Sequence, residues 1–241
     1  MSQTVIVKPT LSQPIFPLNI RSVNEIFPGF ALGDFAVLQG SSSVLSLASL
    51  LCVKAQLPTQ LGGLETNVIF IDGGNTFRLY QIAQIAQIHY LNPKDLLDNI
   101  FISRAFTAYQ ATSLISHHLK DAIRKYNAKL VIISDIAGLF LDNDIPEDEA
   151  QRIFCQAAIF LSNFTRENQT IVIATYPPHA ETTRNNLLHT QIIKKASVVL
   201  SLRKTSYARQ FVLEKHPDLS TGVAELQLED LTLVDFAEVN A

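Results

Sequence analysis

Several features that would assign a protein to a special class are missing from this sequence. No apolar run among the 241 residues reaches the length of about 20 that a membrane-spanning helix requires. Residues 1–10 lack the basic start and long apolar stretch of a secretion signal. We therefore expect a cytoplasmic protein without a membrane partner.

The sequence also has few cysteines and no excess of positive charge. The two cysteines, Cys52 and Cys155, lie in apolar segments with helical spacing, which predicts buried free thiols rather than a disulfide or a metal site. His117 and His118 are adjacent on a predicted helix and point apart, so they are poor co-ligands. The formal net charge of −3 does not indicate nucleic-acid binding by the chain as a whole.

The residues that are present indicate a globular α/β protein. A hydrophobic fraction of 47% with 17% charged residues is typical of a chain with a sizeable core. The length predicts one large domain, residues 35–241, preceded by a proline-punctuated N-terminal arm, residues 1–34.

Short β-branched runs alternate with segments of helical periodicity. Strands are predicted at 35–38, 68–72, 99–102, 129–134 and 171–174, and helices at 44–56, 78–90, 110–126 and 147–166. This alternation predicts a mainly parallel sheet flanked by helices. Residues 176–191 are polar and are interpreted as a loop. The segments 197–202, 210–214 and 224–228 are predicted to be late antiparallel strands.

Residues 71–110 carry a series of short motifs. IDGGNTFR starts at Ile71, LLDNI at Leu96 and SRAFTAYQ at Ser103, and they follow Gln56-Leu57-Pro58 and Gly62-Gly63. Together they resemble the core of the RecA/RadA recombinase family over residues 20–230. The resemblance implies a RecA-like P-loop ATPase fold, reduced here to the core domain, and a role in homologous recombination or DNA repair.

The phosphate-binding motif of that family, G-x-x-x-x-G-K-[ST], is degenerate here. Counted from Gly40, Leu45 stands for the second glycine, Ser46 for the lysine and Leu47 for the magnesium-binding hydroxyl. The spacing to Gln56 suggests a shift of two residues, but no register restores a lysine. The serines after Gly40 are also suited to cap a helix, whose N-terminus attracts anions in any case.

Three further family positions are replaced. Gly74 stands where the resemblance places a catalytic glutamate, Ser134 where it places a magnesium-linked aspartate, and Tyr176 where it places a glutamine. Asp135 follows Ser134, but one step along a strand turns a side chain to the other face. We therefore expect a pseudo-ATPase with no catalytic residue and no cofactor. Residual ATP binding through a rearranged site is an alternative.

The family's DNA-contacting loops are only partly basic here. The first, residues 141–151, holds five acids and no base, which indicates a helix-capping surface or a partner-docking patch. Residues 184–215 hold seven bases against one acid, and the alternative to nucleic-acid binding is a sheet edge guarded by lysines. The nucleic-acid candidates are Arg184, Lys194, Lys195, Arg203, Lys204 and Arg209.

These observations favour a catalytically inactive RecA/RadA-like paralogue that assists recombination or repair. It would bind DNA or an active recombinase, and the core-against-core packing of the family implies a homo-oligomer, with a dimer expected. The alternative is a regulatory or structural RecA-fold oligomer without DNA binding, as in the clock-protein branch of the superfamily.

Overall fold

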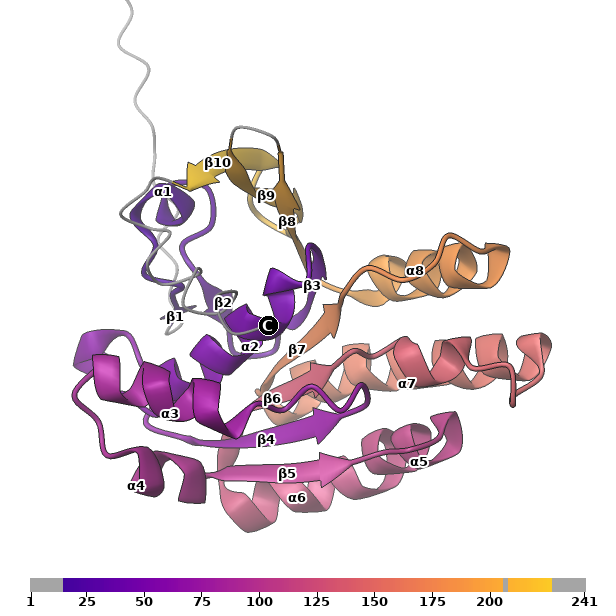
Figure 1. Cartoon of the computed structure of the whole chain (residues 1–241), viewed down its shortest axis with the longest axis horizontal. Helices are drawn as coiled ribbons and strands as arrows, with labels where there is room; N and C mark the ends of the chain where they lie inside the picture. Colours follow the sequence, from indigo (N-terminus) through magenta and orange to yellow (C-terminus); the bar gives the residue numbers. More distant parts are fainter. Residues whose placement is uncertain (1–14, 206–207, 227–241) are drawn as a thin grey trace, which may run out of the picture.

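The computed structural model describes residues 15–205 and 208–226 and is built around one eight-stranded sheet (Figure 1). The strand order is β10-β9-β8-β3-β7-β6-β4-β5. Neighbours from β8 to β5 pair in parallel, whereas β9 pairs antiparallel with both β8 and β10. The α/β fold with antiparallel late strands is thereby confirmed. The segment at 197–202 differs from its prediction, because β8 is parallel to β3.

The strands of the structure are short and mostly buried. Their bounds are β1 Ile15–Phe16, β2 Phe30–Ala31, β3 Phe35–Gly40, β4 Asn67–Asp72, β5 Ile100–Arg104, β6 Ala128–Ser134, β7 Ile171–Tyr176, β8 Val198–Lys204, β9 Arg209–Lys215 and β10 Gly222–Leu226. The predicted strand at 224–228 extends past the described residues at its end.

The helices from α2 to α8 connect successive parallel strands, whereas α1 lies between β1 and β2, which are antiparallel. Their bounds are α1 Arg21–Asn24, α2 Ser43–Lys54, α3 Leu79–Ile88, α4 Pro93–Asp98, α5 Ala108–Ser113, α6 Leu119–Tyr126, α7 Glu147–Asn168 and α8 Thr183–Lys195. A π-helical turn, Leu114–His118, joins α5 to α6, and short 3-10 helices lie at Thr59–Leu61 and Gly138–Leu141.

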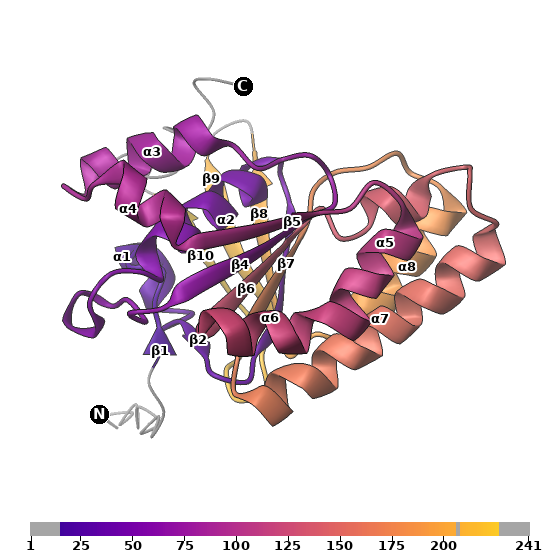
Figure 2. The ribbon, with the colours of Figure 1, turned by 90° about the horizontal axis from the view of Figure 1, so that it is seen from below.

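Helices cover both faces of the sheet, as Figures 1 and 2 show. Alternate strand residues face α2, α3 and α4 on one side, where Leu38, Phe70 and Ile132 are buried. The residues between them face α5 to α8 on the other side, where Val37 and Val131 are buried. Parallel strands that are buried on both faces need apolar residues at nearly every position. The sequences of these strands are therefore nearly continuous apolar runs.

Residues 15–34 pack on the α2 side of the sheet. Phe16 and Phe30 pair across β1 and β2 and are fully buried with Phe27. Lys54, at the end of α2, is 4% exposed and donates hydrogen bonds to the backbone oxygens of Pro17 and Leu18. Burial lowers the pKa of Lys54 to about 8. This lysine therefore holds the N-terminal segment and lies far from the beginning of α2.

The prediction of a loop over 176–191 is wrong, because α8 occupies most of it. Thr182 caps this helix, its hydroxyl accepting the N–H of Asn185. Leu188 and Ile192 are buried in one narrow stripe, Leu187 is exposed, and most of the other helix residues are polar. The apolar stripe is thin, so the segment has the composition of a loop.

Candidate functional site

The carboxyl ends of the parallel strands form the edge on which a RecA-like fold would place its chemistry. Strand register aligns Asp72 of β4 with Ser134 of β6 and with Arg104 of β5. It likewise aligns Gln39 of β3 with Tyr176 of β7 and Ser201 of β8. Two polar rows therefore lie at this edge, one on each side of the β6–β7 boundary.

The connection between β3 and α2 contains only two residues, Ser41 and Ser42. Gly40 adopts a φ of +98°, and a Cβ there would lie 2.3 Å from the backbone oxygen of Leu202 in β8. The N–H of Ser41 donates to that same oxygen at 2.8 Å. This connection is therefore fixed against the neighbouring strand.

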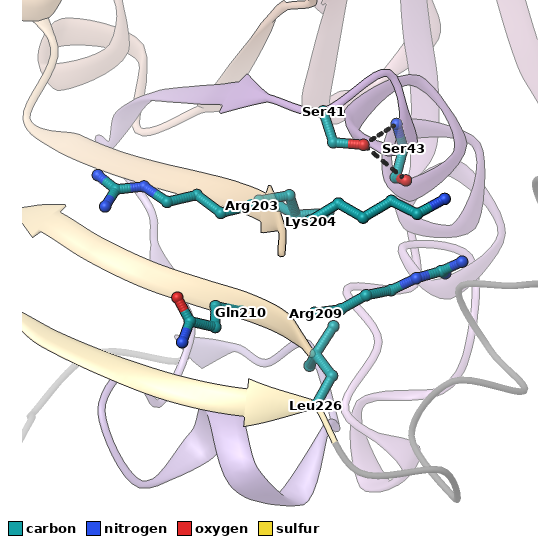
Figure 3. A pocket seen from close by; sticks show the side chains of 8 residues that line it. Ser41, Ser43, Arg203, Lys204, Arg209, Gln210 and Leu226 are labelled. Atoms are coloured by element: carbon teal, nitrogen blue, oxygen red, sulfur yellow. Dashed lines mark hydrogen bonds between the residues drawn. The ribbon is translucent and has the colours of Figure 1, made fainter. Parts of the chain in front are cut away.

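Four backbone donors around this short connection, those of Ser41, Ser43, Val44 and Leu45, have partners within the protein. The N–H of Ser43 donates to the Ser41 hydroxyl at 3.3 Å, a contact drawn in Figure 3. The N–H groups of Val44 and Leu45 donate to the carbonyls of Ser41 and Ser42. A phosphate cradle needs such groups to point at the ligand from a wider loop. The connection here lacks the length for that arrangement.

The positions predicted for the lysine and the magnesium hydroxyl lie inside α2. Leu47 is 3% exposed and belongs to the core on this side of the sheet. Ser46 is half-buried, and its hydroxyl accepts a hydrogen bond from the Gln81 side chain at 3.2 Å. Neither side chain offers a cation to a phosphate.

Asp72 is completely buried and its carboxylate is engaged on both oxygens. The N–H of Thr76 donates to Oδ1 at 2.8 Å, and the Arg104 guanidinium contacts Oδ2 at 3.1 Å. The Thr76 hydroxyl also makes a short contact with the Ser134 hydroxyl. Asp72 therefore organises the turn after β4 and the end of β5, and Gly74 in that turn carries no side chain.

Asp135 lies just past β6 in a left-handed conformation, with φ of +48°. Its carboxylate accepts the N–H of Gly138 at 3.1 Å and contacts Nε2 of His179 at 2.8 Å. The side chains of Asp135 and His179 are 14% and 19% exposed. This pair holds the segment after β7 against the segment after β6.

An open cleft lies over the second polar row, between the ends of β3, β7 and β8 and the flank of α8. Gln39, Tyr176 and Ser201 form its floor, and His179, Asn186 and His189 stand on its walls. Burial, with a smaller effect of Asp135, raises the pKa of Tyr176, so its phenol stays protonated. The sequence did not reveal this cleft; its one local signal was the polar Gln39 in an apolar strand.

The basic candidates divide between opposite edges of the sheet. Arg203 and Lys204 end β8, and Arg209 begins β9 directly opposite Lys204. Arg184 lies in the first turn of α8, at the same carboxyl edge. Lys194 and Lys195 end α8 and precede β8, so they lie at the amino edge. The six residues therefore do not make one surface.

At the carboxyl edge, the β8–β9 hairpin carries three cations, Arg203, Lys204 and Arg209, which point to two different sides. Figure 3 shows Lys204 and Arg209 extending side by side toward the beginning of α2, while Arg203 extends the opposite way. Arg203 contacts the Glu214 carboxylate at 2.6 Å, which compensates part of its charge. Lys204 and Arg209 lie directly opposite each other, so two like charges face each other across the strands.

The acidic segment after β6 lies partly on a helix. Asp142 and Asp144 precede α7, and Glu147, Asp148 and Glu149 form its first turn. Acids at that position interact favourably with the helix dipole. All but Glu149 are exposed, and the N-cap residue Pro146 makes no side-chain capping hydrogen bond, so the acids favour the helix through its dipole and leave a negative surface.

The cysteines and histidines show no metal centre in the described ranges, 15–205 and 208–226, where no group of three candidate ligands comes together. Cys52 and Cys155 are free thiols; Cys52 is buried and Cys155 is partly buried. His117 and His118 are both exposed. None of the helices within those ranges has the length and apolarity needed to cross a membrane.

The family of the chain follows from comparison with known proteins. The family model described as Rad51 matches residues 19–176, well over half of the chain. The chain belongs to the Rad51 family. The resemblance to RecA/RadA recombinases, predicted from the motifs around residues 71–110, is thereby confirmed.

One curated relative is the "DNA repair and recombination protein RadA" of Cenarchaeum symbiosum (strain A). It is 29% identical over 123 residues, which are 51% of this chain and 28% of that protein. The match therefore spans under a third of the relative's length. The printed name of the relative assigns that protein to DNA repair and recombination.

Proposed function

We propose that this chain is a Rad51-family protein that does not hydrolyse ATP and that assists DNA recombination or repair by binding. The observation that carries this proposal is the short connection between β3 and α2, where the N–H groups of Ser41, Ser43, Val44 and Leu45 are already bonded within the protein. Ser46, Leu47 and Gly74 at the positions of the lysine, the hydroxyl and the glutamate support it.

The contacts of the remaining acids favour the same proposal. Asp72 is paired with Arg104, and Asp135 is paired with His179 and a backbone N–H. Magnesium prefers carboxylates together with nucleotide phosphates and water. The Asp72 carboxylate is held by Arg104 at the end of β4, and the Asp135 carboxylate is hydrogen-bonded to His179 and Gly138 just past β6, so both are poorly placed to serve a metal.

Mg-ATP is expected to leave the thermal unfolding midpoint unchanged. A ligand present at 100 times its dissociation constant and bound by the folded state alone would raise stability by about 2.7 kcal/mol, a shift of several degrees. Differential scanning fluorimetry with millimolar Mg-ATP measures this directly. The variant Ser46→Lys is the matched control, and it too should show no shift, because one lysine does not lengthen the connection. A midpoint that rises with Mg-ATP in the unaltered chain would refute this part of the proposal.

The binding surface that we propose is the carboxyl edge of the sheet. Arg184, Lys204 and Arg209 lie there, with Arg203 beside the cleft. Lys and Arg side chains bind nucleic acid chiefly through phosphates. The partner proposed from this charge is DNA, alone or held by an active recombinase, with a homodimer as the acting form.

Labelled single-stranded DNA is expected to bind at low salt and to dissociate as salt rises. Each phosphate that a cation neutralises contributes about −0.7 to the slope of log K against log salt for single strands. Three to four contacts therefore predict a slope of about −2 to −3, which fluorescence anisotropy at several salt concentrations measures. Binding that is insensitive to salt would contradict a phosphate-based surface.

A second candidate function is a structural or regulatory protein without DNA contact. The exposed acids at 142–148 favour it, because a negative surface repels phosphate and suits a basic protein partner. Absence of DNA binding even at low salt, together with a stable complex with a recombinase or with a second copy, would support this candidate over the first.

A further inference from the structure

The cleft at the ends of β3, β7 and β8 has a volume of about 370 Å³ and opens to solvent. That volume lies at the lower end of the range typical of small-ligand sites, about 300–1,000 Å³. Positions two residues earlier on the same face, such as Val37 and Val199, are apolar and buried. The polar residues of the floor are therefore a local change in the character of the sheet, confined to its carboxyl edge.

The floor is a connected hydrogen-bond network. Gln39 donates from Nε2 to the Ser201 hydroxyl at 2.9 Å and to the Glu214 carboxylate at 2.7 Å. Ser201 and Arg203 both donate to the other oxygen of Glu214, at 2.7 and 2.6 Å. The negative charge of Glu214 is thus compensated within the network. The floor is held in place and favours an uncharged group above it.

The side chains around the floor combine flat rings with atoms that can form hydrogen bonds to a ligand. His189 contacts the Gln39 side-chain oxygen through Nε2 at 2.5 Å, so Nε2 carries hydrogen and Nδ1 is left as an acceptor. Burial, opposed by Glu214, lowers the pKa of His189 and favours this neutral form. Tyr176 stands edge-on to His189 and His179, with ring centroids 5.0 and 5.8 Å apart. Asn186 is exposed at the mouth, with an amide that can both donate and accept.

We propose that this cleft receives one unstacked nucleobase of a single-stranded nucleic acid. A base offers flat faces to the histidine rings, and its edge matches the acceptor and amide groups of the walls. Arg203 lines the cleft, where a phosphate of the same strand would pass. The inference rests on the proposed DNA binding and assigns it a base-contacting site.

The test uses the variant Asn186→Trp, which fills the mouth of the cleft from an exposed helix position. The matched control is Leu187→Trp, which places the same ring on the neighbouring exposed position outside the cleft. Anisotropy with a labelled 15-nucleotide thymidine strand should show about a tenfold loss of affinity for Asn186→Trp. The control should stay within about twofold of the unaltered chain.

A second probe separates bases from phosphates. A strand of the same length with abasic sugars keeps the phosphates, so the unaltered chain should bind it about tenfold more weakly, and Asn186→Trp should no longer distinguish the two strands. Equal binding of both strands by the unaltered chain, or unchanged affinity of Asn186→Trp, would overturn the base site while leaving DNA binding intact. No binding of either strand by the unaltered chain would overturn the proposed DNA function and the base site together.

Discussion

Replacing Gly40 by alanine should lower the free energy of unfolding by about 3 kcal/mol or more. Its φ of +98° lies in the left-handed region, where a side chain costs about 1–3 kcal/mol. The added Cβ would also lie 2.3 Å from the backbone oxygen of Leu202, which cannot move aside without shifting β8. Urea denaturation of Gly40→Ala measures the loss.

Ser42→Ala is the control for this substitution. Ser42 stands at the N-cap of α2 but makes no side-chain capping hydrogen bond, so its loss should change stability by less than about 0.5 kcal/mol. A Gly40→Ala variant as stable as Ser42→Ala would contradict a connection held tightly against β8. It would also remove the main support for the absence of a phosphate cradle.

Gly40 illustrates how a family motif can persist for a different physical reason. The sequence places it as the first glycine of a phosphate loop. In the structure its missing side chain lets β3 and β8 approach at Leu202. The same glycine therefore serves strand pairing, a requirement that remains when the lysine and the second glycine are replaced.

The sheet could be predicted because its strands carry their own signal. One example is the short β-branched and aromatic run Val68-Ile69-Phe70-Ile71, which ends at a polar residue and a glycine pair. In the structure β4 contains this run and extends it by one residue at each end. The helix α8 gave a weaker signal. Leu188 and Ile192 lie one turn apart, and Thr182 precedes Asn185 by the spacing of an N-cap. Polar composition outweighed these two cues in the sequence.

The sequence alone supports the prediction that Ser46 stands at the position of the phosphate-loop lysine, but it does not predict the cleft. Gln39, Tyr176 and Ser201 come from three separate strands, and parallel pairing brings them into one row. His189 joins them because α8 packs against that edge. Contacts across about 160 residues depend on strand order and register, which motif spacing does not determine.

Strand direction also divides the basic segment that appears continuous in the sequence. Lys194 and Lys195 precede β8, whereas Lys204 is its last residue, so the other six residues of the strand, 198–203, separate the two groups. At about 3.3 Å per residue, that separation is about 20 Å, more than the Debye length of about 8 Å at physiological ionic strength. The two groups therefore act as separate electrostatic features.

The double variant Lys204→Glu/Arg209→Glu should lower affinity for single-stranded DNA at least tenfold at low salt. Both side chains extend from the β8–β9 hairpin at the carboxyl edge, where the proposed strand passes (Figure 3). Reversing them removes two phosphate contacts and adds repulsion. The slope of log K against log salt should fall in magnitude by about 1.4, that is about 0.7 for each contact. Fluorescence anisotropy across a salt series gives both quantities.

The matched control is Lys194→Glu/Lys195→Glu. Each double variant changes two cations to two anions and takes the net charge from −3 to −7, so the general repulsion of DNA is equal. The control should lose less than about threefold in affinity, because its residues lie at the amino edge. Equal losses in both variants would mean that only overall charge matters. A loss confined to the amino-edge variant would place the binding surface at the opposite side of the sheet and exclude the base-binding cleft from it.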